Sequence, residues 1–277
     1  MTFADRQVPA PGEIFLDHVG WFLPSLTEAE AFARLGFPLT PYTAHQNADP
    51  QGGPPVRSGT ANRCAMLRRG YLEFLEAVPE LDTPLTRQHR AAVARYAGVH
   101  LLAFTVADAA AEAARLAAAG FAPDPVVLLR RATDIGEARF SVVRTALERM
   151  PEGRIQTLVQ ETPEIVWQER FIGRDNGIDA LAGVVLEVAD PAEAAARYGR
   201  YLGRPAAANR VVLDRGRLIF RRGSGIVPRM SAVELVSRDL TLTRDYLKAH
   251  GVSAADRDGA LTVEAAGAAL VIYNQPP

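Results

Sequence analysis

The sequence is poor in several residue types on which common kinds of protein depend. Its one cysteine, Cys64, excludes an internal disulfide framework and a cysteine-rich zinc site. Lysine is almost absent, because Lys248 is the only lysine among 31 basic residues. No apolar run has the length needed to cross a membrane, and the first residues lack the basic start and apolar run of a signal peptide. We therefore expect a cytoplasmic protein.

The balance of charge and apolar residues is that of an ordinary globular protein. The net charge of −1 argues against a nucleic-acid or membrane-surface partner. Apolar residues make up 48% of the 277 positions, which is enough for a buried core, and the length suits two domains. The sequence has no phosphate-binding glycine loop, no nucleophile-elbow serine and no His-Glu-x-x-His zinc helix. The expected partners are a small-molecule substrate and a second copy of the chain in a homodimer.

Four stretches of the chain look like copies of one short unit. Each is an apolar strand that leads into a stretch with helical periodicity, and the copies begin at His18, His100, Ala182 and Ser231. An internal repeat of this kind indicates a fold built from similar modules. Only the first two copies carry a histidine at the matching place. We therefore expect the chemistry to lie in the first half of the chain.

Each copy continues into further strands, which predicts a βαβββ module. The periodicity predicts helices over 26–35, 86–97, 109–119, 192–202 and 240–249. It predicts strands over 14–22, 61–68, 71–78, 99–106, 126–130, 139–147, 154–160, 181–188, 210–213, 217–221, 232–236, 260–263 and 268–273. Residues 41–58 are rich in Pro, Gly, Asn and Gln, and we expect them to form a long irregular loop.

The order of these elements predicts an α+β fold, in which four βαβββ modules pair into two curved mixed sheets. The concave side of such a sheet is a natural pocket. The turn-rich segment Gly173–Gly177 suggests a boundary between two domains. We expect residues 1–173 to carry the site, and residues 174–277 to form a degenerate second pair that serves as a scaffold or a dimerisation surface.

Several short motifs resemble those of a known superfamily. Asp17-His18-Val-Gly-Trp-Phe resembles the opening strand, and Tyr71-Leu-Glu73-Phe-Leu-Glu76 the closing strand, of vicinal oxygen chelate proteins (glyoxalases, extradiol dioxygenases and bleomycin-resistance-like proteins). More narrowly, residues 59–63 (Gly-Thr-Ala-Asn-Arg) and 162–167 (Thr-Pro-Glu-Ile-Val-Trp) look like glyoxalase-like domain proteins. The resemblance covers roughly residues 14–171.

The resemblance implies a metal site whose ligands come from the first and last strands of two paired modules. Carried over by position, these ligands are His18 and Glu73 from the first module, and His100 and Gln156 from the second. The two spacings are 55 and 56 residues. Gln156 departs from the family pattern, where Glu is more common. The metal would be Zn, Ni, Mn, Co or Fe, and Glu73 could also leave it to act as a catalytic base.

A purely structural role is the alternative for the histidines and for Glu73. A strand histidine among apolar neighbours is often a satisfied core residue, and a buried Glu73 could pair with Arg63 or Arg144 instead of a metal. His45 lies in the expected loop, where it could line the mouth of the pocket, although a loop histidine is usually solvated. His89 and His250 have charged neighbours on helices and are expected at the surface.

Two functions from different classes remain open. The first is a divalent-metal-dependent lyase or isomerase that acts on a small oxygenated metabolite and stabilises an enolate or related anion. The second is a metal-free small-molecule binder of the bleomycin-resistance kind. Extradiol ring cleavage is less favoured, because the position where it needs Glu is Gln156. Metal content distinguishes the first two.

Overall fold

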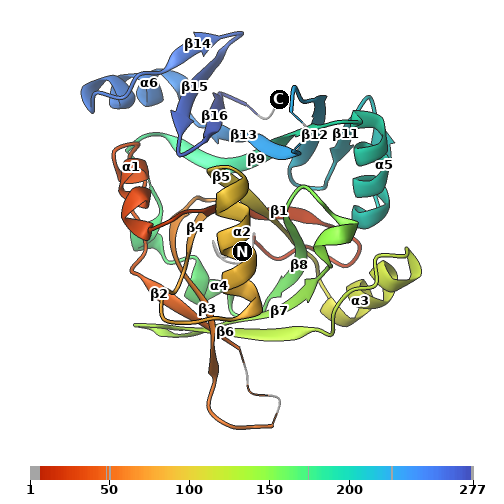
Figure 1. Cartoon of the computed structure of the whole chain (residues 1–277). Coiled ribbons are helices and arrows are strands. Elements are labelled where there is room, and N and C mark those ends of the chain that lie inside the picture. Colours follow the sequence, from red (N-terminus) through yellow and green to blue (C-terminus); the bar gives the residue numbers. More distant parts are fainter. Residues whose placement is uncertain (1–6, 48, 50, 174, 226, 276–277) are drawn as a thin grey trace.

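The structure is a computed structural model that describes residues 7–47, 49, 51–173, 175–225 and 227–275. It confirms the predicted α+β architecture of four βαβββ modules (Figure 1). The first six residues of the segment in which no signal peptide was expected lie outside the described residues. Residue 174, in the predicted domain boundary, also lies outside them. Across the described ranges, no helix is long and apolar enough to cross a membrane.

The first half of the chain contains two modules joined by a helix. The first module comprises β1 (Phe15–Phe22), the 3-10 helix η2 (Leu26–Ala29), α1 (Glu30–Ala33), β2 (Thr43–Asn47), β3 (Val56–Met66) and β4 (Tyr71–Ala77). The linking helix is α2 (Pro84–Arg95). The second module comprises β5 (Gly98–Thr105), α3 (Ala109–Ala118), β6 (Val127–Thr133), β7 (Gly136–Arg144) and β8 (Arg154–Gln160), and the short α4 (Pro163–Val166) follows it.

The second half repeats the scheme with shorter strands. The third module comprises β9 (Ile178–Val188), α5 (Pro191–Leu202), β10 (Ala206–Ala207), β11 (Arg210–Val212) and β12 (Arg217–Arg222). The fourth comprises β13 (Arg229–Ser237), α6 (Leu240–Ala249), β14 (Ala255–Arg257), β15 (Ala260–Ala265) and β16 (Ala268–Tyr273).

A side-chain cap starts the helical segment of every module. The side chains of Ser25, Asp108, Asp190 and Asp239 each accept hydrogen bonds from backbone N–H groups of the first turn. Such caps satisfy donors that have no partner within the helix itself. The four helices therefore begin where a local sequence signal places them.

The sheet of the first two modules closes on itself to form an eight-stranded barrel. Its strand order is β1-β4-β3-β2-β6-β7-β8-β5, and β5 pairs back with β1. The far side closes where Gln46 and Asn47 of β2 pair with Arg130 and Leu129 of β6. The expectation of an irregular loop over residues 41–58 was therefore wrong for 43–47 and 56–58, which belong to β2 and β3. Strand β2 is held by partners far away in the chain, which local composition does not reveal.

The sheet of the last two modules stays open. It runs β10-β11-β12-β9-β13-β16-β15-β14, so β10 and β14 are its edges. Met230 of β13 pairs with Val99 of β5 and joins both halves into one 16-stranded sheet (Figure 1). The two expected sheets are thus continuous, one closed and the other open.

One hydrophobic core spans the two halves. Leu16 and Val19 of β1 belong to the same buried cluster as Val184 and Leu186 of β9, and all four side chains are fully buried. A second cluster, which includes Phe22, fills much of the barrel interior. The open sheet of the second half therefore packs on strands that carry the site. The division into two domains near residue 173 stays a prediction.

Candidate active site

Four polar side chains point into the barrel from different strands. His18 of β1, His45 of β2, Glu73 of β4 and Gln156 of β8 line one small cavity of about 50 Å³. His18 is only 4% exposed and Glu73 only 5%. Buried groups of this kind need hydrogen-bond or charge partners. Three of the four residues are predicted ligands, and the structure brings these three together.

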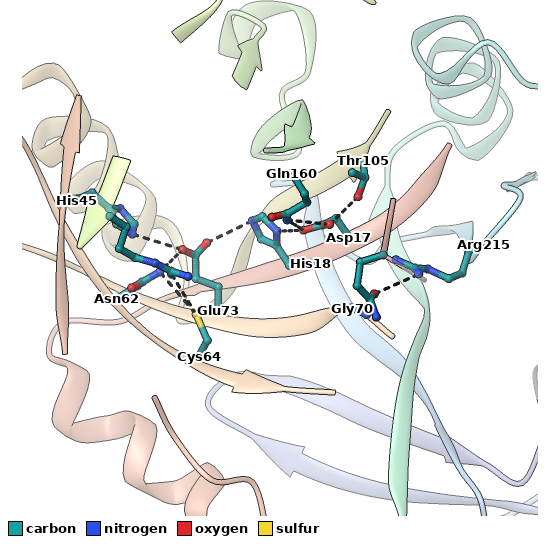
Figure 2. A network of polar contacts seen from close by, with 12 residues as sticks. Asp17, His18, His45, Asn62, Cys64, Gly70, Glu73, Thr105, Gln160 and Arg215 are labelled. Atoms are coloured by element: carbon teal, nitrogen blue, oxygen red, sulfur yellow. Dashed lines mark hydrogen bonds and ion pairs between the residues drawn. The ribbon is translucent and has the colours of Figure 1, made fainter. Parts of the chain in front are cut away.

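His18 is the middle member of a line of polar contacts that joins Asp17 to Glu73 (Figure 2). Its Nδ1 lies 2.6 Å from Oδ1 of Asp17, and its Nε2 lies 3.4 Å from Oε2 of Glu73. Asp17 is itself fixed, because Thr105 Oγ1 donates to its Oδ2 at 2.5 Å and Gln160 Nε2 donates to both oxygens at 3.1–3.2 Å. The ring of Tyr71 stacks on the imidazole with a centroid distance of 4.4 Å. The imidazole is therefore held in one orientation, with Nε2 facing Glu73.

A β-bulge allows Asp17 and His18 to interact although they are consecutive residues. Leu16 pairs with Phe104 and His18 with Ala103, so Asp17 is an extra residue in β1. Consecutive side chains of a regular strand point to opposite faces, and a bulge breaks this alternation. The Asp–His contact therefore depends on the pairing of β1 with β5.

Glu73 has two further partners, neither of which the sequence singled out for this role. Asn62 Nδ2 of β3 donates to its Oε1 at 2.6 Å, and His45 Nε2 lies 3.7 Å from the same oxygen. The alternative that Arg63 or Arg144 pairs with Glu73 is not what the structure shows. Arg63 forms its ion pair with Glu30. Figure 2 shows the carboxylate between the two imidazoles, with His45 on one side and His18 on the other.

The pKa values of this cluster are shifted in opposite directions. Burial alone lowers the pKa of His18, but its hydrogen bonds with Asp17 and Glu73 and their charges outweigh burial and raise it to about 9. Burial raises the pKa of Glu73, but His18, the charge of His45 and the Asn62 hydrogen bond lower it to about 2. Burial and three nearby arginines lower the pKa of His45 to about 4. At neutral pH, His18 is thus a cation, Glu73 an anion and His45 neutral.

The structure does not bring His100 to this cluster. Its Nε2 donates to the carbonyl oxygen of Tyr96 at 2.8 Å, and its ring stacks on that of Tyr96 at 3.9 Å. Burial lowers its pKa to about 4. His100 is the extra residue of a second bulge, because Gly20 pairs with Leu101 and Trp21 with Val99. Its side chain lines a larger cleft next to this cavity and not the cavity itself.

The strand registers show why the predicted equivalence of the two histidines needs correction. Glu73 pairs with Gly20 in the parallel pair β4–β1, and Gln156 pairs with Ala103 in β8–β5. Glu73 and Gln156 are therefore equivalent, and they are separated by 83 residues. The residue 83 positions after His18 is Leu101, which lines the cavity. A one-residue shift in a strand moves a side chain to the other face, which removes His100 from the site.

Two other histidines also differ from expectation. His45 was expected in a solvated loop but is 7% exposed, and its Nδ1 lies 3.1 Å from Thr60 Oγ1 inside the barrel. His89 was expected at the surface but is 2% exposed, and its Nε2 donates to the carbonyl oxygen of Leu75. His250 is exposed, as expected. No local signal marked His45, because β2 exists only through its pairing in the barrel.

The donor set does not fit the metal site that the resemblance implies. The position that would supply the second histidine is Leu101, and the two imidazoles that do approach Glu73 lie on opposite sides of its carboxylate. Within the described ranges, no three His, Cys, Asp or Glu side chains form a group that could hold a metal ion. Arg131 and Arg154 line the same cavity, and their positive charges oppose a divalent cation.

A larger cleft opens from this cavity toward the surface. Its volume is about 570 Å³, and Figure 1 shows α2, which supplies one wall, lying across the barrel. The cleft and the inner cavity share Ser58, Leu85, Arg144 and Arg154 as lining residues. A volume of this size is typical of small-molecule sites. One bound molecule can therefore contact both the cleft and the His18–Glu73 pair.

Comparisons with known proteins place the chain in a family. The profile of the glyoxalase-like domain matches residues 16–221, which is more than half of the chain. The chain belongs to the glyoxalase-like domain family. No curated protein matches the chain. The resemblance to this family in the sequence is thereby confirmed, and the match extends into the third module.

Solved structures show the same fold at low sequence identity. A hypothetical protein from Staphylococcus aureus aligns with a TM-score of 0.66 and 10% identity, over 94% of this chain and 98% of its own. A mutant of 4-hydroxymandelate synthase from Streptomyces coelicolor aligns with a TM-score of 0.56 and 15% identity, over 97% and 94%. A fusion protein of a xylose isomerase-like TIM barrel and 4-hydroxyphenylpyruvate dioxygenase aligns with a TM-score of 0.57 and 11% identity. The alignment covers 90% of this chain and 40% of the fusion protein. The protein thus has a vicinal oxygen chelate fold.

Proposed function

We propose that this protein is an enzyme of the lyase or isomerase type, which acts on a small oxygenated metabolite and moves a proton with His18 and Glu73. The observation that carries the proposal is the buried line Asp17–His18–Glu73, with the imidazole held between two carboxylates at the inner end of a cleft. Charged groups buried in this way are expensive in a scaffold but common in catalytic sites.

Each residue of the line has a distinct role in the proposed reaction. Asp17 holds Nδ1 of His18, so the Nε2–H group is the donor that faces the cavity. A substrate carbonyl oxygen that accepts this hydrogen bond displaces Glu73 from His18. Without its cationic partner, the buried carboxylate gains basicity and takes the proton from the carbon next to the carbonyl. Protonated His18 stabilises the enolate oxygen, and Glu73 then returns the proton to carbon.

Exchange of carbon-bound hydrogen for deuterium tests this proposal. Small α-hydroxy and α-keto acids would be incubated with the protein in D₂O, and the signal of the hydrogen next to the carbonyl or carboxyl carbon followed by NMR. We expect exchange with the wild type and its loss in His18→Ala and Glu73→Gln. The matched control is His250→Ala, because His250 is exposed and is not part of the cleft lining. Equal exchange in Glu73→Gln and wild type would contradict the proposal.

A divalent-metal-dependent form of the same reaction was expected from the resemblance, and elemental analysis decides it. Purified protein would be analysed for Zn, Ni, Mn, Co and Fe, alongside His18→Ala and Glu73→Gln. The donor geometry favours less than one metal per chain, with no change in the variants. A stoichiometric metal that both variants lose would show that His18 and Glu73 rearrange to bind it.

A metal-free binder is the second candidate, and the volume of the cleft favours it. A cleft of about 570 Å³ can sequester a small molecule without any reaction. Binding of an α-keto acid by calorimetry, together with no deuterium exchange at any pH between 5 and 9, would favour this function over the enzyme. We further propose that the second half acts as a scaffold for the barrel.

A further inference from the structure

Two arginines stand where the cleft meets the inner cavity. Arg144 ends β7 and Arg154 begins β8, and both side chains line the cleft as well as the cavity that holds His18 and Glu73. Arg154 is buried, with 9% of its surface exposed, and its guanidinium lies 4.9 Å from the centre of the Phe22 ring. Two guanidinium groups therefore face the route along which a ligand enters.

Neither arginine forms an ion pair with an acidic side chain among the described residues. Both Nε and Nη2 of Arg154 donate to the amide oxygen of Gln88 on α2, which carries no charge. The Nε atom of Arg144 is buried, and no hydrogen-bond partner for it exists in the part of the chain that the structure describes. Asp124 also lines the cleft and its charge acts on Arg144, but the described residues form no ion pair between them. The charge of Glu73 likewise acts on Arg154, but no described acid forms an ion pair with either guanidinium.

Two other arginines of the chain, Arg197 and Arg217, show the paired arrangement for comparison. Arg197 is 13% exposed and pairs with Glu152, which is 2% exposed. Arg217 is 14% exposed, and its Nε and Nη2 both donate to Glu234, which is 2% exposed. A buried cation without a counter-charge is costly, so folding alone favours the paired arrangement. The missing partner at Arg144 and Arg154 indicates a counter-charge that arrives with a ligand.

We propose that Arg144 and Arg154 form an anion site, which holds a carboxylate or phosphate group of the substrate while its reacting carbon lies at His18 and Glu73. The planar fork of a guanidinium matches both of these anions and binds them by paired hydrogen bonds. The reaction at the inner end rests on the proposed function, whereas the anion site rests only on the arginines. The substrate class is accordingly a small oxygenated molecule with at least one anionic group.

Anion binding is measured with inorganic phosphate and with malonate, each against sodium chloride at equal ionic strength, by calorimetry at pH 7. The variants are Arg144→Gln and Arg154→Gln, and the matched control is Arg139→Gln, which removes the same charge from an exposed position of β7. We expect phosphate, malonate or both to bind the wild type, and each cleft variant to weaken that binding by at least about tenfold. Stronger binding of phosphate or of malonate distinguishes the two kinds of substrate.

Thermal unfolding separates an anion site from a structural role of these arginines. Arg144→Gln should leave the Tm unchanged or raise it, because it removes a half-buried charge that has no ion pair among the described residues. Arg217→Gln should lower the Tm, because it leaves Glu234 buried and unpaired. Equal losses of Tm in the two variants would overturn the proposal. The proposal would also be overturned if neither phosphate nor malonate bound more tightly than chloride, or if both cleft variants bound these anions as well as the wild type.

The His18→Gln variant keeps the two proposals distinguishable. Anion binding that persists in this variant without deuterium exchange in the wild type would leave the anion site intact and refute the enzyme. Deuterium exchange that is unaffected by Arg144→Gln and Arg154→Gln, with anions no better bound than chloride, would refute the anion site and leave the enzyme.

Discussion

Asp17 and His100 occupy equivalent positions, because each is the extra residue of a β-bulge in the central strand pair β1–β5. The same pattern recurs in the second half, where Ser231 and Ala182 are two of the extra residues of the pair β13–β9. The first bulge turns the side chain of Asp17 toward His18. The second leaves the side chain of His100 in the lining of the cleft. The proposed catalytic line Asp17–His18–Glu73 therefore depends on a bulge in the pairing of β1 with β5.

Leu101→His is expected to increase the affinity of the cavity for a divalent metal ion. Leu101 is the register equivalent of His18 and lines the same cavity as Glu73 and Gln156. A second imidazole at this position would complete the donor set that the family resemblance implies. Cobalt(II) binding, followed by its visible absorption, should strengthen by at least about tenfold. His100→Ala is the control and should change nothing. No gain in Leu101→His would contradict the register argument.

The stability of the protein should decrease as the pH rises from about 6.5 to about 9. Folding raises the pKa of His18 from 6.5 to about 9, so its contribution is complete below pH 6.5 and is lost as the pH passes through 9. Folding lowers the pKa of Glu73 from 4.5 to about 2, so its contribution disappears only in acid. The Tm of His18→Gln should fall less steeply over this range than that of the wild type. Parallel profiles would refute the assignment.

Asp17→Asn is expected to lower the pKa of His18 while leaving its orientation largely in place. The asparagine keeps a hydrogen-bonding oxygen near Nδ1 but removes the negative charge that helps to raise the pKa. The shift should be about one pH unit or more. An NMR titration of the His18 Cε1 hydrogen measures it, with Asp179→Asn, a half-buried acid of the second half, as the control. An unchanged pKa would show that Glu73 alone controls the imidazole.

Leu186→Ala tests the proposal that the second half is a scaffold for the barrel. Leu186 of β9 is fully buried in the cluster that also contains Leu16 and Val19 of β1. Its truncation should reduce the free energy of unfolding by about 2–5 kcal/mol, because it leaves a cavity. Anion binding at the folded barrel should be unchanged. Val212→Ala, in which the residue is 63% exposed, should have little effect on urea unfolding. Equal effects of the two variants would argue against a shared core.

The sequence by itself determined the modular architecture and part of the site. Apolar alternation and helical periodicity located the four modules, and the caps Ser25, Asp108, Asp190 and Asp239 mark their helical segments. Glu73 and Gln156 were also matched correctly from their closing strands. These signals are local, since capping and alternation involve residues within a few positions of each other. The sequence also holds a signal for the bulges, because Asp17, His100, Ala182 and Ser231 each lie eight residues before the cap of their module.

Only the tertiary structure decided which histidines meet Glu73. The side chain of His100 faces away because β1 and β5 pair with a bulge, and His45 faces inward because β2 closes the barrel against β6. Both pairings join segments about 80 residues apart, so no short window of the sequence contains both partners. A shift of one residue exchanges the two faces of a strand, which makes the site sensitive to this long-range pairing. The tertiary structure also decided that Arg144 and Arg154 form no ion pair with a described acid, because their neighbours come from distant strands and helices.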